Sequence, residues 1–154
     1  MDKVMSYVKE QKYLGMVGHG LIIIGSFLPL MTISVSLFGV SKSESFSYIQ
    51  AGGAGWITVI LSLVALLMIF ADKLVDKVPA FERFLNQKLT LIPTVISVVI
   101  LIANLANYSA SGTAALVSSL ANVTFGIGFW LIVVGLVAAV VYPFLYKGVS
   151  TSQD

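Results

Sequence analysis

Two hydrophobic patterns follow one another along this chain. Four long apolar stretches contain no charged residue, at about 14–30, 55–71, 89–107 and 125–146. After the first of them, residues 31–37 alternate strictly between apolar and polar side chains. Apolar runs of roughly 20 residues are typical of membrane-spanning helices, and strict alternation is typical of a half-buried strand. The pattern therefore predicts an all-α membrane protein, a bundle of four transmembrane helices with a strand-like segment after the first.

The alternating segment predicts a small extracellular β-hairpin between the first two spans. Pro29 disfavours continuation of the first helix. The apolar positions that follow would share one face of a strand: Met31, Ile33, Val35 and Leu37. Unpaired strand backbone is not tolerated in lipid, so the segment is expected outside the hydrocarbon, paired with its own continuation. The expected strands are residues 30–38 and 45–50, joined across the serine-rich sequence FGVSKSES.

The segment between the third and fourth spans favours a short helix. Leu116, Leu120 and Val123 recur there at helical spacing. An extension of the fourth helix beyond the membrane fits the same spacing. Either element would cover the apolar face of the hairpin.

The composition restricts the class of protein. Of the 154 residues, 58% are hydrophobic and 10% are charged, and the mean hydropathy is +0.98. About a quarter of the residues are charged in ordinary soluble domains. The chain is therefore expected to form a single membrane domain over residues 1–154. It contains no cysteine, which excludes disulfides and thiolate chemistry.

The positive charges predict the orientation in the plasma membrane. Of the nine lysine and arginine residues, only Lys42 lies in an expected external loop. Because positively charged loops stay in the cytoplasm, both termini and the loop 72–88 are expected there, with loops 31–54 and 108–124 outside. The net charge of +2 gives no reason to expect a nucleic-acid partner.

The cytoplasmic loop 72–88 has a helical period of its own. Its apolar residues would share one face of a helix: Leu74, Val78, Phe81 and Leu85. An interfacial amphipathic helix, interrupted at Pro79, fits this period. A charged connector between the second and third spans fits it as well.

The layout resembles that of the claudin-type tetraspan proteins. Four spans, internal termini, a larger first external loop with β character and a shorter second loop are shared with that group. Claudins carry a tryptophan-rich motif with a cysteine pair in the first external loop, whereas the nearest tryptophan here, Trp56, begins the second span. The resemblance therefore implies a topology, and no functional residue is transferred. The short loops and the absence of cysteine are also similar to small four-span bacterial membrane proteins.

Small residues in the first span predict close helix packing. Gly15, Gly18 and Gly25 make this helix slim, so that the backbone of a neighbour can approach closely. Packing within the bundle, for instance against Ala65, and association of two copies both fit this spacing. The fourth span permits the same two interpretations through its own glycines: Gly126, Gly128 and Gly135.

Few polar groups are expected within the spans. His19 is the only histidine, and an ionisable residue in a membrane helix is by default a candidate proton-linked site. The structural alternative is a neutral histidine that is hydrogen-bonded to a neighbouring helix. Asn104 and Asn107, at the outer end of the third span, are expected to bond across helices or to line a polar vestibule with Thr58 and Ser62.

Catalytic chemistry is not indicated. The spans contain no carboxylate pair, and the chain has no metal-ligand cluster and no Gly-x-Ser-x-Gly motif. A non-catalytic protein without cofactor or metal is therefore expected. The leading prediction is that its external loops or its spans bind a membrane or secreted protein partner, as an immunity protein or an accessory subunit would. The candidate contact residues are Ser34, Ser36, Phe46 and Tyr48.

Two other functions fit the sequence as well. A small oligomeric channel or transporter for a neutral solute would use Ser, Thr and Asn residues on the helix faces. The acidic rings of cation pores and the buried charges of transporters are missing from the spans. A lipid-binding membrane organiser would instead use an apolar groove between the helices.

Overall fold

The computed structural model of the protein describes residues 2–37, 40–50, 52–71, 87–110 and 121–145. These residues form four α-helices, a short 3-10 helix and three β-strands. In chain order they are α1 (Asp2–Phe27), β1 (Pro29–Leu37), β2 (Val40–Ser47), α2 (Gly53–Ile69), η2 (Gln87–Thr90), α4 (Leu91–Ala110), β3 (Ala121–Phe125) and α6 (Ile127–Leu145). The chain is thus mostly helical, as its apolar stretches predict.

The helix boundaries follow the predicted ones, with one large difference. α1 begins at Asp2 rather than at residue 14, so the polar segment before the apolar run is helical as well. It ends at Phe27, because the proline at position 29 disfavours helical backbone at the residue before it. α4 carries Pro93 in its first turn, where a missing N–H does little harm.

Two helices are long and apolar enough to cross a membrane, among the residues that the structure describes. They are Lys88–Asn107 and Ile127–Leu145. Two shorter apolar helices accompany them, Lys12–Phe27 and Gly53–Ile69. Length and composition alone thus mark two membrane-crossing helices where the sequence pattern predicts four.

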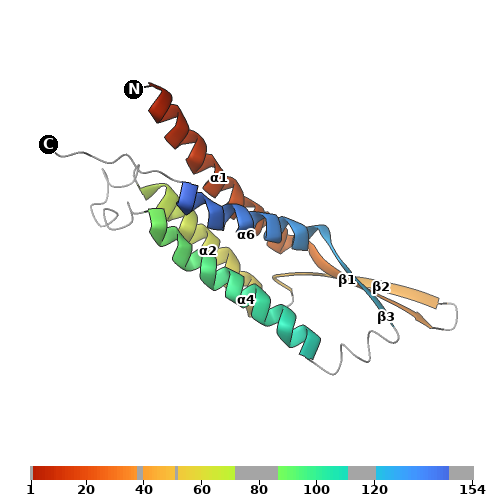
Figure 1. The fold of residues 1–154 in the computed structure, drawn as a ribbon. Helices are drawn as coiled ribbons and strands as arrows, with labels where there is room; N and C mark the ends of the chain where they lie inside the picture. Colours follow the sequence, from red (N-terminus) through yellow and green to blue (C-terminus); the bar gives the residue numbers. More distant parts are fainter. Residues whose placement is uncertain (1, 38–39, 51, 72–86, 111–120, 146–154) are drawn as a thin grey trace.

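The four long helices lie side by side in a bundle, and α1 packs most extensively against α6 (Figure 1). α2 packs against α1 on one side and against α4 on the other. The core combines residues from the helices with Leu30 at the start of β1 and Tyr48 just after β2; its members are Ile22, Leu30, Tyr48, Leu101, Ile132, Leu136 and Ala139. The sheet extends away from the end of the bundle that is opposite to the start of α1 (Figure 1).

The hairpin forms, but its second strand begins earlier than predicted. β1 and β2 are antiparallel and pair from Leu37 with Val40 down to Pro29 with Ser47. β2 was expected only from residue 45, because serines and charged residues were interpreted as a turn. In the structure these residues alternate in register with β1, and residues 48–50 form a turn instead.

A third strand replaces the predicted helical structure before α6. Residues 121–125 form β3, which pairs antiparallel with β1 and gives the strand order β2-β1-β3. The prediction of a short helix, or of an extension of the fourth helix, is therefore wrong for these residues. Pairing with β1 satisfies the backbone of this short segment, and α6 starts only after Gly126. Residues 111–120 and the predicted amphipathic helix of 72–86 lie outside the described residues.

Candidate functional site

The two faces of the sheet differ completely in chemistry. On one face, Ile33 of β1 lies between Glu44 of β2 and Val123 of β3. On the other face, Ser34 lies between Ser43 and Asn122. Because side chains alternate along a strand, this register places the apolar and charged side chains of the three strands, from Met31 to the tip of the hairpin, on one face and the hydroxyl and amide groups on the other.

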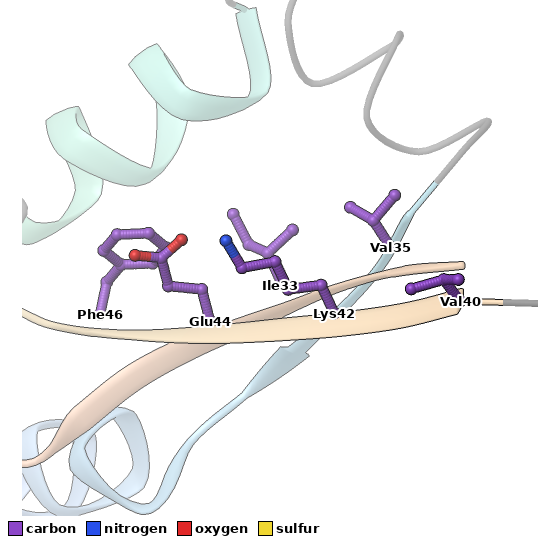
Figure 2. A pocket seen from close by; sticks show the side chains of 6 residues that line it. All are labelled: Ile33, Val35, Val40, Lys42, Glu44 and Phe46. Carbon is purple, nitrogen blue, oxygen red and sulfur yellow. The ribbon is translucent and has the colours of Figure 1, made fainter. Parts of the chain in front are cut away.

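The apolar face carries an open groove. Its volume is about 390 Å³, and it is lined by alternate residues of two strands: Ile33, Val35, Val40, Lys42, Glu44 and Phe46. Figure 2 shows these six side chains rising from the same side of the sheet. Val40, near the tip of the hairpin, is 72% exposed. The groove is therefore an apolar surface with two charged groups, held outside the helix bundle.

The two charged residues of the groove face no countercharge across the sheet. Lys42 is paired with Val35 and Glu44 with Ile33, so both neighbours on β1 are aliphatic. Both charged residues are exposed. Two opposite charges two positions apart on one strand thus remain available to a molecule that approaches the edge of the sheet.

β2 is an edge strand. Within the described part of the chain it pairs with β1 alone, and its residues from Val40 to Ser45 are exposed. The outer edge of such a strand presents unpaired N–H and C=O groups, which can accept a further strand. The open edge and the groove therefore belong to one continuous surface.

The hydroxyl face contains regular cross-strand pairs of small polar residues. Thr32 and Ser45 are hydrogen-bonded through their side-chain oxygens at 2.9 Å. The next pairs toward the tip join Ser34 with Ser43 and Ser36 with Ser41. Such hydroxyl pairs stabilise a two-stranded ribbon by a few tenths of a kcal/mol to about 1 kcal/mol each.

The four residues singled out as partner contacts occupy three different places. Ser34 and Ser36 lie on the hydroxyl face, and Phe46 lies in the groove on the opposite face. Tyr48 is only 2% exposed and belongs to the hydrophobic core. Its proposed role as a surface contact is wrong, since its position in the turn after β2 directs it inward.

Tyr48 directly follows β2 and packs in the hydrophobic core. Burial raises the pKa of its phenol above the usual value, and the nearby Thr58 side chain opposes this effect. The Thr58 hydroxyl donates to the Ala54 carbonyl at 3.1 Å, and no described residue makes a hydrogen bond of good geometry with the Tyr48 oxygen. The neutral phenol is thus held mainly by packing.

Three glycines of the first span, Gly15, Gly18 and Gly25, lie in the seam between α1 and α6. A Cβ atom at Gly25 would lie 2.8 Å from the carbonyl oxygen of Gly128, and one at Gly15 would lie 2.8 Å from the ring of Tyr142. Gly18 faces the backbone of Ala139 in the same way. In the structure these small residues therefore serve packing within the bundle.

His19 is 1% exposed, and neither of its ring nitrogens has a hydrogen-bond partner among the described residues. The expected bond to a neighbouring helix is thus not formed there. The hydroxyl of Ser62 on α2 is buried without a partner as well. Other buried hydroxyls donate to the carbonyl group four residues earlier in the chain: Ser26 to Ile22, Thr94 to Thr90 and Ser97 to Pro93.

The two asparagines of α4 do not form the predicted vestibule. The side-chain amide of Asn104 donates to the carbonyl oxygen of Ile100 in its own helix at 2.7 Å, and Asn107 is exposed. Thr58 and Ser62, their expected neighbours, are both buried on α2. Neither asparagine is therefore part of a shared polar site with α2 in the way that the sequence suggested.

Sequence reasoning did not single out Lys42, Glu44 or the strand β3. The signal for the first two was present, since VSKSESFS alternates serine with other residues from Val40 onward.

No group of three or more potential metal ligands of the His, Cys, Asp or Glu type occurs among the described residues. Comparison with known proteins gives no match to a family model, to a curated protein or to a solved structure.

Proposed function

We propose that this chain is a four-span membrane protein whose external sheet binds a protein partner. The observation that carries the proposal is the open edge of β2 beside an apolar groove, on a sheet that extends beyond the helices. This is a binding function without catalysis.

The outward faces of all four helices support insertion in a bilayer. Each helix exposes large apolar side chains along its length, for example Val17 on α1, Leu63 on α2, Val99 on α4 and Val137 on α6. In water such faces would be an aggregation hazard, whereas in lipid they match the solvent. The apolar part of α1, Lys12–Phe27, and helix α2 therefore join α4 and α6 as spans.

Aromatic residues support a membrane boundary at the base of the sheet. Trp56 at the start of α2 and Trp130 at the start of α6 are both about half exposed. Trp56 contacts Phe27 edge to face, with ring centroids 6.1 Å apart. Tryptophan is enriched at membrane interfaces. The sheet, which begins at Pro29, would then project directly from the outer interface, with the lysine-rich ends on the cytoplasmic side.

Strand addition is the binding mode that this surface fits. An extended segment of a partner would bond to the main chain of β2 and place alternate side chains over the groove. The groove side would take apolar residues against Val40 and Phe46, and polar residues would lie on the serine side. Main-chain bonds would supply affinity, and the groove would supply selectivity.

Native mass spectrometry of the protein, extracted gently from its own membrane, tests the proposal. We expect a discrete complex that is weakened by Val40→Asp, since this change places an unpaired charge in the apolar groove. Ser41→Ala, its neighbour on the hydroxyl face, serves as the matched control and should leave the complex intact. A complex that withstands both Val40→Asp and Phe46→Ala, in variants of unchanged thermal stability, would contradict the proposal.

A further inference from the structure

The sequence of the β2 edge strand is complementary to itself in the antiparallel direction. If a second copy of β2 lies beside the first with a two-fold axis at Ser43, Lys42 of each copy faces Glu44 of the other. The same axis places Val40 opposite Phe46 of the second copy, and Ser41 opposite Ser45. Apolar, charged and hydroxyl residues would thus each meet a matching partner.

We propose that the β2 edge binds the β2 edge of a second copy of this chain, which joins two three-stranded sheets into one. The proposal rests on the proposed function and names the partner of the same surface. A two-fold axis normal to the sheet keeps the groove face of one copy on the same side as that of the other. The interface would be isologous, as in most homodimers.

The charges select this register over its neighbours. Residues that face each other across antiparallel strands must lie on the same face of the sheet, so the axis can shift only by whole residues. An axis at Lys42 places the two lysines opposite each other, and an axis at Glu44 does the same for the two glutamates. Like charges directly opposite destabilise a strand pair. Only the axis at Ser43 pairs both charges with opposite ones.

The environment of the two charges supports the same partner. Their neighbours on β1 are Val35 and Ile33, so neither charge faces an opposite charge across the paired strands. Charged groups on an edge strand reject strands that lack matching charges. A second copy would place its Glu44 opposite Lys42 and its Lys42 opposite Glu44.

The direction of the strands determines how the two copies would be arranged. β2 runs from the tip of the hairpin at Val40 back to the bundle at Ser47 (Figure 1). Antiparallel pairing therefore sets the tip of each hairpin beside the base of the other. The two helix bundles would lie at opposite ends of the joined sheet, so the contact is head to head, between two membranes that face each other.

Cysteine cross-linking in vesicles tests this arrangement, because the chain has no cysteine of its own. Each variant is reconstituted at full length, and two vesicle populations, one with a tagged protein, are mixed and oxidised. Ser43→Cys should form a dimer between tagged and untagged chains, since each residue faces its own copy at the axis. Ser41→Cys alone should not, but Ser41→Cys mixed with Ser45→Cys should. No link at Ser43, or a link only within one population, overturns the proposal.

Charge reversal provides a second test that is independent of the disulfide. Lys42→Glu alone and Glu44→Lys alone should each weaken vesicle association by about tenfold, because two attractive pairs become repulsive. Mixing these two variants should restore it, and so should the double variant Lys42→Glu/Glu44→Lys. Equal association of all variants overturns the proposal. If Val40→Asp disrupts a complex with a different protein while Ser43→Cys gives no dimer, the binding function stands and the self-partner fails.

Discussion

Gly18 of α1 and Gly135 of α6 are in direct backbone contact. A Cβ atom at Gly135 would lie 2.6 Å from the carbonyl oxygen of Gly18, and one at Gly18 would lie 2.9 Å from the carbonyl oxygen of Gly135. Side chains cannot be inserted at either position without separating the two helices. The seam therefore depends on the absence of side chains at this crossing.

Gly18→Leu should destabilise the protein, because the added side chain meets backbone atoms that cannot move aside. Overpacking of this kind typically costs about 1–3 kcal/mol or more. The thermal midpoint of the variant in detergent is the measurement. Gly20→Leu is the matched control on the same helix, since a Cβ there has no neighbour within 4 Å. Equal midpoints for both variants would contradict the seam.

Ser62→Ala should leave stability unchanged or raise it. The hydroxyl of Ser62 is buried without a described partner, and an unsatisfied buried polar group costs about 1–3 kcal/mol. Ser97→Ala is the comparison, because the Ser97 hydroxyl donates to the Pro93 carbonyl at 2.9 Å. Chemical or thermal unfolding of the two variants measures the difference. If Ser62→Ala is the more destabilising of the two, the hydroxyl has a partner, such as a bound water.

Tyr48 should make stability fall at high pH. Its pKa is raised by burial, so the folded protein holds the phenol proton more tightly than the unfolded chain. The resulting stabilisation is complete below the unfolded value of about 10 and is lost as the pH rises above it. Thermal midpoints across this range should decline more in the wild type than in Tyr48→Phe. The remaining tyrosines are common to both proteins, so parallel curves would show that Tyr48 does not contribute.

Tryptophan fluorescence should place Trp56 and Trp130 at the same depth in the bilayer, near the lipid headgroups. The chain has two tryptophans, so Trp130→Phe leaves Trp56 as the only one, and Trp56→Phe leaves Trp130. Lipids with a quencher near the headgroup should quench both variants more than lipids with a quencher near the end of the acyl chain. Strong quenching from the bilayer centre in either variant would contradict this placement of the membrane.

Local sequence patterns predict much of the fold, but they do not predict the pairing of strands that lie far apart in the sequence. The alternation of 31–37 and the break at Pro29 were sufficient to predict β1 and the end of α1, because both depend on neighbouring residues. Val123, Thr124 and Phe125 favour strands, but β3 has only five residues and its partner β1 lies far away in the sequence, so the local pattern does not distinguish it from the beginning of the next helix.

The candidate surface was predictable in part for the same reason. Period-two alternation correctly separates Ser34 from Ile33 on opposite faces. The start of β2 was misplaced, because serines and charges around Lys42 are common in turns as well as on exposed edge strands. The sequence pattern places Tyr48 on the surface, whereas it lies in the core. Its burial depends on how the turn after β2 packs onto the helices, and the spacing of residues along the chain carries no information on that packing.

The seam between α1 and α6 has a consequence for biosynthesis. α1 has its most extensive contacts with α6, and β1 likewise pairs with a strand that is made just before α6. Both α1 and β1 must therefore wait in an incomplete state until α6 has been translated and inserted. Chains interrupted before α6 would expose the glycine seam and one edge of β1, and we expect quality-control proteases to remove them quickly.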